Sequence, residues 1–441
     1  MPRWAIRSVW MLLAATLAAC GTNGMQLPQS PMLASLERKS GLIALVGTDN
    51  NIYTIDQAGG NLRAITEDAS EGELLYDMPT WAPGGSRLAY IGISTPPEGG
   101  AEGSIYSAAE EGTTSTIYRS DVYLPFYLYW SPDGQWLSFL TSPGSSQIPL
   151  ALQMASAEGG QVSLLDTGRP FYWAWSPRER KLLVHAGGSA QSNPESARLA
   201  FLDVLEPVVE TGVSVPPANF QAPAFSPDGA HLLFAGENAA GGQTLMLTDA
   251  LGELEASVTE FQGAVAFGWA HTGDYAAYIV SRTADGPVIG DLSLVNLGDP
   301  ASPVVTDLEA EQVAGFFWSP DGKQLAYFVP ALAQPQGEEA TPQPDTDAGQ
   351  GPIYLQMHVV QARNGQSKQI ATFRPSDRFL NLLFAFDQYQ RSATIWSPDS
   401  RYLVVPATDG QEQQGLFIVP ASGAFEPRFL TEGVLGFWSW E

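Results

Sequence analysis

The four histidines are the first residues to consider for chemistry, because imidazole is a common proton carrier and metal ligand. They are His185, His231, His271 and His358, and no two of them stand four residues apart, as in a zinc-binding helix. The chain has no Gly-x-Ser-x-Gly segment and so no nucleophile elbow of the serine hydrolase type. We therefore expect no catalytic residue, no metal ligand and no cofactor, although a site assembled from scattered residues stays open.

Cys20 is the one cysteine of the chain, and its surroundings point to covalent modification. It follows a positively charged start and an apolar run that is too short to span a bilayer. Leu17-Ala18-Ala19-Cys20 resembles the lipobox of bacterial lipoproteins. The resemblance implies a signal peptide over 1–19, lipidation of Cys20 and an extracytoplasmic location on a bacterial membrane. An ordinary signal peptide is the alternative, and 20–40 reads as a flexible tether.

A short phrase recurs along the rest of the chain. Trp130-Ser131-Pro132-Asp133-Gly134 and Trp318-Ser319-Pro320-Asp321-Gly322 are identical, and weaker copies occur elsewhere. The first residues of these copies, the anchors, are separated by 49, 45, 50, 44, 49, 78 and 42 positions. Apolar residues stand seven and nine positions after each of the first seven anchors, and a separation of two is the period of a strand. The anchors are Trp81, Trp130, Trp175, Phe225, Trp269, Trp318, Trp396 and Trp438.

Each repeat reads as a strand that ends near its anchor, a tight turn and further strands. Four short antiparallel strands in this interval form one blade of a β-propeller, whose faces are buried only between neighbouring blades. The anchor rings then pack between blades. We predict an all-β chain with a single propeller of four-stranded antiparallel blades over residues 41–441. Eight blades is the predicted number, and seven is the alternative.

The two ends of this region complement each other. Segments 42–46, 51–55 and 62–66 read as the last three strands of a blade, whereas Phe437-Trp438 reads as a first strand. Pairing of the C-terminal strand with the N-terminal strands would close the ring and remove its open edge. Residues 330–351 are rich in Pro, Gln and acids, and we predict a disordered insertion there between the second and third strands of a blade.

The repeated Trp-Ser-Pro-Asp-Gly turns resemble those of TolB-type propellers and of the propeller domain of prolyl oligopeptidases. This resemblance covers nearly all of 41–441 and implies the fold, but it implies no particular function. The chain departs from both families. We expect no N-terminal α/β domain like that of TolB proteins, and no stretch of this sequence has room for the hydrolase domain of the peptidases.

Composition limits the partners. The chain has 21 Lys and Arg against 47 Asp and Glu, a net charge of −26, which argues against binding to nucleic acid or to anionic lipid through a basic surface. Aromatic residues near the loops that enter the innermost strands suit contact with a protein or a glycan. Alternatively, these rings point inward and fill the channel wall or the space between blades. The residues of this candidate binding face are Phe126, Tyr127, Phe171, Tyr172 and Phe220.

Together these features lead us to expect a membrane-anchored extracytoplasmic propeller that binds a protein or ligand of the cell envelope without catalysis. One alternative is a propeller enzyme of the glycosidase or lyase type, with carboxylates converging at the channel mouth. Another is a binding lobe for a separate peptidase.

Overall fold

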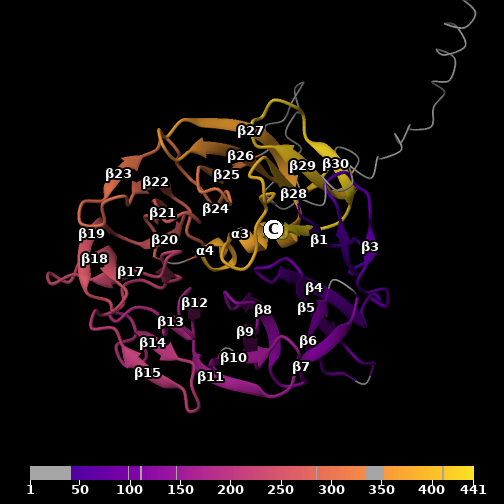
Figure 1. The fold of residues 1–441 in the computed structure, drawn as a ribbon, viewed down its shortest axis with the longest axis horizontal. Helices are drawn as coiled ribbons and strands as arrows, with labels where there is room; N and C mark the ends of the chain where they lie inside the picture. Colours follow the sequence, from indigo (N-terminus) through magenta and orange to yellow (C-terminus); the bar gives the residue numbers. More distant parts are fainter. Residues whose placement is uncertain are drawn as a thin grey trace, which may run out of the picture. The chain divides into compact units, whose positions relative to one another are not determined.

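Antiparallel strands form nearly all the regular structure of the computed structural model, which describes residues 41–441 except 98, 110–111, 146, 285, 333–351 and 410–411. Within these residues there are six sheets of four strands and one sheet of seven. The sheets follow one another in sequence order around a common centre (Figure 1). The prediction of an all-β propeller is therefore confirmed.

The strands of the first sheets are β31 (Leu435–Trp438), β1 (Ile43–Val46), β2 (Ile52–Ile55) and β3 (Arg63–Ala64), then β4 (Leu74–Trp81), β5 (Arg87–Ser94), β6 (Glu102–Ala109) and β7 (Thr114–Ser120). Next come β8 (Leu124–Trp130), β9 (Trp136–Ser142), β10 (Leu150–Ser156), β11 (Val162–Gly168), β12 (Phe171–Trp175), β13 (Lys181–Ala186), β14 (Arg198–Asp203) and β15 (Val209–Gly212). They are followed by β16 (Ala224–Phe225), β17 (His231–Glu237), β18 (Gln243–Asp249), β19 (Leu254–Phe261), β20 (Ala264–Trp269), β21 (Tyr275–Ser281), β22 (Asp291–Asn296) and β23 (Val304–Asp307). The remaining elements are β24 (Gly315–Trp318), β25 (Gln324–Leu332), β26 (Ile353–Gln361), β27 (Ser367–Pro375), α3 (Asp377–Leu383), α4 (Phe386–Tyr389), β28 (Tyr402–Thr408), β29 (Gln414–Pro420) and β30 (Arg428–Glu432).

The tail of the chain completes the sheet formed by its head. β31 pairs antiparallel with β1, with Ile43 opposite Trp438 and Val46 opposite Leu435. β1 pairs in turn with β2, so the order in this sheet is β3-β2-β1-β31. The predicted closure of the ring by the C-terminal strand is therefore confirmed, and the pairing leaves no open edge on β1.

The number of blades stays a prediction. The seven-stranded sheet contains β24–β27 and β28–β30, which are joined through two residue pairs, Arg374 with Thr408 and Pro375 with Ala407. Trp396, the anchor that precedes β28, forms an isolated bridge with Leu403 rather than a strand. Counting β28–β30 as a separate blade gives the predicted eight.

The prediction of a disordered insertion over 330–351 is wrong for its first three positions. β25 continues through Leu332 and pairs with β26, so positions 330–332 belong to a strand. Most of the predicted range, 333–351, lies outside the described residues, as do Cys20 and the whole of 1–40. The signal peptide, the lipidation and the disorder of the insertion therefore stay predictions.

The repeat owes its regularity to one pairing that recurs in each unit. In all seven internal copies the anchor lies opposite the residue seven positions later, as with Trp130 and Leu137. Between them the chain reverses in a turn that is bonded internally. Ser131 Oγ donates to Asp133 Oδ1 at 2.5 Å, Asp133 Oδ1 accepts from the backbone N–H of Gln135, and Gly134 takes a positive φ of 66°. The turn chemistry that the sequence suggested is therefore present.

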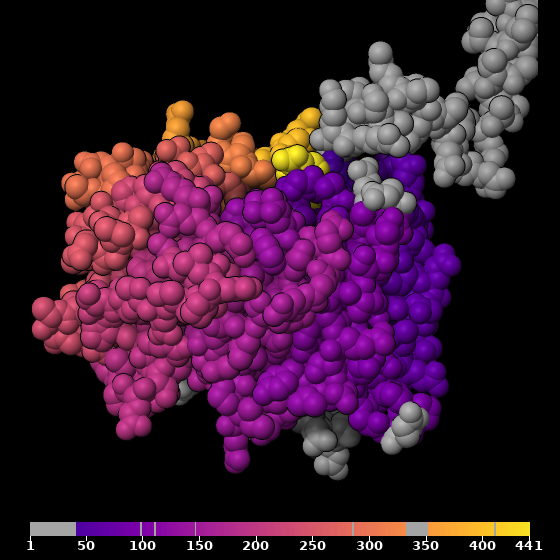
Figure 2. All heavy atoms as spheres, turned by 60° about the horizontal axis from the view of Figure 1, so that its bottom comes forward, coloured from indigo at the N-terminus to yellow at the C-terminus, as the bar shows by residue number. Residues whose placement is uncertain are grey.

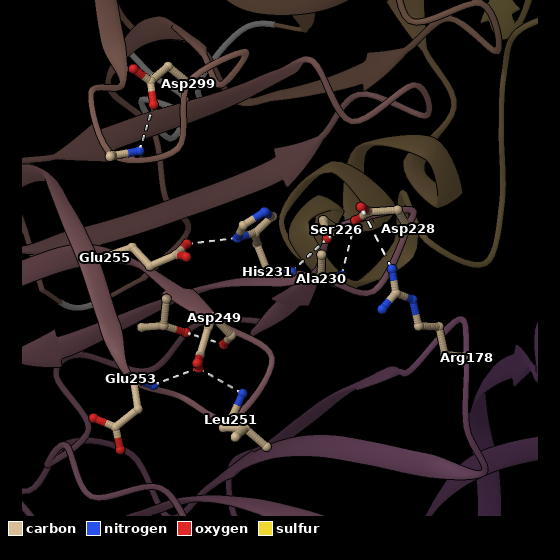
Figure 3. A network of polar contacts seen from close by, with 12 residues as sticks. Arg178, Ser226, Asp228, Ala230, His231, Asp249, Leu251, Glu253, Glu255 and Asp299 are labelled. Atoms are coloured by element: carbon tan, nitrogen blue, oxygen red, sulfur yellow. Dashed lines mark hydrogen bonds and ion pairs between the residues drawn. The ribbon is translucent and has the colours of Figure 1, made fainter.

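The same turn follows the anchor Phe225 (Figure 3). Ser226 donates to Asp228, and this bond lowers the pKa of the Asp228 carboxyl. Arg178, from the preceding turn, approaches the same carboxylate at 3.9 Å. Such contacts link the turns of neighbouring sheets along one face of the ring.

The anchor rings also join neighbouring sheets. In four of the eight anchors the indole N–H group donates to the backbone carbonyl of the residue that precedes the previous anchor, whereas the indole nitrogens of Trp269 and Trp438 have no partner among the described residues. These bonds are Trp130 to Thr80 at 2.9 Å, Trp318 to Gly268 at 3.2 Å, Trp396 to Phe317 at 2.8 Å and Trp81 to Phe437 at 3.3 Å. Trp175 reaches Ser138 Oγ at 2.9 Å, and this hydroxyl donates to Tyr129 O, so the same link is relayed. Position in the repeat therefore gives these rings a structural contact with the preceding sheet.

The core lies between facing sheets. Ile91 and Ile105 of one sheet, for example, pack against Leu137 and Phe139 of the next, and all four side chains are buried. The colour in Figure 2 passes gradually along the side of the ring, because sheets adjacent in sequence are also adjacent in space. This arrangement holds the first strand of each sheet next to the centre.

Candidate functional site

A helical segment occupies the centre of the ring. Residues 376–395, here called the central segment, connect β27 to the strand region around β28 and include α3 and α4 (Figure 1). Ser376 caps α3, because its Oγ accepts from the N–H of Phe379 at 3.2 Å. Phe379, Leu382 and Leu383 share one face of α3 and are buried.

The inner strands need partners at the centre, because each is the first strand of its sheet and one of its edges has no neighbouring strand. The side chain of Gln388 acts as that partner for Trp173 in β12. Gln388 Oε1 accepts from Trp173 N at 3.1 Å, and Nε2 donates to Trp173 O at 3.0 Å. A carboxamide carries the same donor and acceptor as a peptide group, so Gln388 extends the sheet by one residue.

Gln388 also binds the neighbouring sheet. Its Nε2 donates to the hydroxyl of Tyr127 at 3.0 Å, and this hydroxyl donates to Gln388 O at 3.0 Å. The ring of Tyr389 meets that of Tyr127 edge-on, with centroids 4.9 Å apart. Burial raises the pKa of the Tyr127 hydroxyl, which therefore stays a neutral donor and acceptor.

Further residues of the central segment bind the residues that lead into β16 and the strand β20. Asp387 Oδ2 accepts from the N–H of Ala222 at 3.1 Å, and Gln390 Nε2 donates to Phe267 O at 3.2 Å. Arg391 donates to the carbonyls of Ala222, at 2.9 Å, and Pro223. Residues 387–391 thus provide hydrogen-bond partners for buried backbone groups of three neighbouring sheets.

On the other side of the centre, α3 binds β4 through charge. Arg378 Nη1 lies 3.3 Å from Asp77 Oδ1, and Arg378 Nη2 donates to Asn50 Oδ1 at 2.6 Å. Burial raises the pKa of Asp77 despite the opposing effect of Arg378. Met78 follows at a positive φ of 53°, within an irregularity of β4, so the backbone bends where the two charges meet. The central segment is therefore bonded to strands on opposite sides of the centre.

A cavity of about 210 Å³ lies beside the central segment, on the face that carries the anchor turns. Gln390 and Arg391 contribute to its lining from the central segment, and exposed residues such as Pro177 and His271 form its rim. The complete lining is Tyr129, Pro132, Ala174, Trp175, Pro177, Ala224, Phe225, Ser226, Pro227, Gly268, Trp269, His271, Trp318, Gln390 and Arg391. Aromatic rings and prolines thus make most of the wall.

Arg391 is the charged group of this cavity. Its Nε donates to Asp387 O at 3.1 Å, so with the bonds to Ala222 and Pro223 the guanidinium is held from three sides. Burial lowers the pKa of Arg391. Because a guanidinium starts from a very high pKa, the group stays positively charged.

The predicted binding face is split by the structure. Tyr127 is 2% exposed and Phe171 1% exposed, so the prediction of a contact face is wrong for these two. They point into the core, where Tyr127 binds the central segment. Phe126 is 39% exposed, and the rings of Tyr172 and Phe220 lie against each other with centroids 4.6 Å apart. For these three residues a contact face stays a prediction.

The four histidines lie in different environments. His185 is buried, both ring nitrogens lie near backbone oxygens, and burial lowers its pKa to about 4. His358 stacks on Tyr327 at 4.8 Å, and His231 contacts Glu255 at 2.7 Å. His271 lies at the cavity rim. Among the residues that the structure describes, no group of three or more His, Cys, Asp or Glu is placed to hold a metal, and no helix is long and apolar enough to cross a membrane.

The repeat pattern of the sequence predicts neither the central segment nor the position of Arg391. A local signal existed, since Ser376-Asp377 is followed by apolar residues three and four positions apart. The unusual spacing of 78 between Trp318 and Trp396 also allowed for more than a loop. The insertion predicted at 330–351 offers a simpler explanation for most of that spacing.

The fold and its filled centre define the class of the protein as a β-propeller. No protein-family model matches the chain, and no curated protein matches it. Similar solved structures include TolB from Acinetobacter baumannii, with 14% identity, 91% of this chain and 67% of that chain covered, and a TM-score of 0.40. An oligogalacturonate lyase in complex with manganese has 12% identity, 86% and 96% coverage, and a TM-score of 0.48. A putative TolB from Agrobacterium tumefaciens has 20% identity, 62% and 90% coverage, and a TM-score of 0.35. Similarities of this size concern the fold and assign no activity.

Proposed function

We propose that the chain is a lipid-anchored extracytoplasmic propeller that binds a ligand or partner of the cell envelope in its central cavity and does not catalyse a reaction. The observation that carries this proposal is the cavity itself. It is lined mainly by aromatic rings and prolines, and the central segment contributes fixed polar groups to it. A concave wall of this kind with a few placed polar groups suits recognition.

Two further features support the proposal. The lipobox-like segment that ends at Cys20 favours a membrane address. The titratable residues among those that line the cavity are Tyr129, His271 and Arg391. None of the described lining residues carries a carboxylate. A glycosidase needs a pair of carboxylates about the scissile bond, so the lining favours binding over the glycosidase alternative.

The proposal predicts a crosslinking pattern in the full-length anchored protein. A photoreactive phenylalanine in place of Pro177, at the exposed cavity rim, should form a covalent adduct with a defined envelope component on illumination of cells. Cys20→Ser should release the chain from the membrane fraction and reduce that adduct, because the protein loses its place at the membrane. Membrane fractionation and mass spectrometry of the adducts measure both effects.

The matched control is the same photoreactive residue in place of Leu164, which is 60% exposed on β11 and does not line the cavity. We expect no specific adduct from that position. Identical adducts from both positions would contradict binding at the cavity. A Cys20→Ser chain that stayed in the membrane fraction would contradict the lipid anchor.

A further inference from the structure

The central cavity differs in charge from the rest of the chain. The sequence contains 47 acidic and 21 basic residues. Of the described residues, those that line the cavity include the cation Arg391 but no Asp or Glu. In a chain this acidic, an acid-free concavity that contains a guanidinium is a local site for a negative group.

The cation has hydrogen-bonding capacity left. A guanidinium has five N–H groups, and three hydrogen bonds tie Arg391 to the carbonyls of Ala222, Pro223 and Asp387. These bonds fix its orientation beside the cavity. Two of the five N–H groups take no part in these three bonds. Because the group is held before a ligand arrives, little side-chain entropy is lost when it binds.

The nearest carboxylate on the central segment does not form a close ion pair with this cation. The two oxygens of Asp387 accept from backbone N–H groups, Oδ2 from Ala222 at 3.1 Å and Oδ1 from Gln388 at 3.0 Å. Burial also raises the pKa of Asp387. The positive charge of Arg391 is therefore only partly offset on its own segment.

The residues that line the cavity indicate which kind of uncharged group the ligand carries. The rings of Trp175, Phe225, Trp269 and Trp318 line the cavity, and Pro177 stands at its exposed rim. Flat aromatic and rigid proline surfaces favour an apolar, preferably aromatic, group of small size. A guanidinium, in contrast, binds carboxylates with two parallel hydrogen bonds.

We infer that this cavity binds a monocarboxylate carried on a small aromatic or apolar body. The carboxylate lies against Arg391, and the apolar body lies against the anchor rings. Two sources offer this chemistry, a free aryl-alkyl acid and the C-terminal residue of a peptide. This inference rests on the proposed function and adds the chemical class of the ligand.

Titration calorimetry on the soluble Cys20→Ser chain tests the inference with paired probes. One pair is 3-phenylpropionate and 3-phenylpropionamide, and the other is N-acetyl-Ala-Phe as the free acid and as the amide. We expect each acid to bind at least about tenfold more tightly than its amide, because only the acid gains charge-assisted hydrogen bonds from Arg391. The acid that binds more tightly identifies the source.

Two variants at the exposed rim residue His271 test the charge without disturbing the central segment. His271→Glu should weaken the binding of both acids about fivefold, because it adds a like charge at the cavity. His271→Gln, a neutral control of similar size, should change the affinity less than twofold. Arg391→Gln should abolish the preference for acid over amide, and circular dichroism checks that this variant folds.

Equal affinity for acid and amide would overturn the inference, as would failure of both acids to bind at millimolar concentration. An effect of His271→Glu no larger than that of His271→Gln would also overturn it. The proposed function fails separately, when crosslinking from Pro177 yields nothing specific. Binding of uncharged probes alone would leave the proposed function intact and refute the carboxylate preference.

Discussion

Replacing Trp438 by alanine is expected to lower the free energy of unfolding by about 3–5 kcal/mol, the usual cost of removing a fully buried aromatic side chain. Trp438 is 0% exposed and packs with Ile43, Leu45 and Val404. Its indole nitrogen has no hydrogen-bond partner in the part of the chain that the structure describes, so the loss comes from packing. Because β31 closes the ring by pairing with β1, the cavity left by Trp438→Ala weakens the closure itself. Equilibrium denaturation in urea measures the change.

Trp440→Ala is the matched control, two residues further along the chain. Trp440 is partly exposed, and its described aromatic contact is an edge-on approach to His271 with ring centroids 5.6 Å apart. Removing such a ring should cost about 1 kcal/mol. If Trp438→Ala destabilised the protein no more than Trp440→Ala, the C-terminal strand would not be the closing element.

Gln388→Leu is expected to destabilise the protein by about 3–5 kcal/mol. Leucine is similar in size but cannot bond Trp173 N and Trp173 O, and it removes the donor to Tyr127. Each buried polar group that loses its partner costs about 1–3 kcal/mol. Thermal and urea denaturation should both show the loss, which reports on the attachment of the central segment to β12.

The control is Gln413→Leu. Gln413 Nε2 donates to Glu432 Oε1 at 2.8 Å in an exposed setting, where water replaces a lost bond. We expect a change within about 0.5 kcal/mol. A Gln388→Leu variant as stable as Gln413→Leu would show that the amide of Gln388 does not serve as a strand partner.

The propeller could be predicted because its main pairings are local and repeated. An anchor such as Trp130 pairs with Leu137 across a turn that the sequence between them specifies. The same spacing occurs in every internal copy, so a weak signal in one repeat is supported by the clearer signal in the others. Closure through β31 followed from counting strands at the two ends, since each end lacked what the other supplied.

The central segment could not be predicted in the same way, because its contacts join residues far apart in sequence without a period. Tyr127 and Gln388 are separated by 261 positions. α3 and α4 are also short, with seven and four residues, and helices of this length depend on tertiary packing rather than on their own propensity. When a segment lies in the centre, its contacts are hydrogen bonds to the backbone groups at the unpaired edges of the inner strands.

This omission also explains the error about the aromatic residues. Tyr127 was one of several rings expected at an exposed face, with the channel wall or the space between blades as the alternative. With an empty centre, its hydroxyl would have faced water, as a contact residue requires. Because Gln388 and Tyr389 occupy that space, Tyr127 is buried and its hydroxyl is bonded within the chain.

Hydrogen–deuterium exchange of the native protein tests the filled centre most directly. Peptides that cover residues 376–395 should exchange as slowly as those that cover β13, because most residues of both segments are buried or half-buried and both belong to one cooperative unit. Protection of the central segment over hours is the expected result. Complete exchange of 376–395 within seconds, with β13 still protected, would show that the centre is open and would contradict the cavity built upon it.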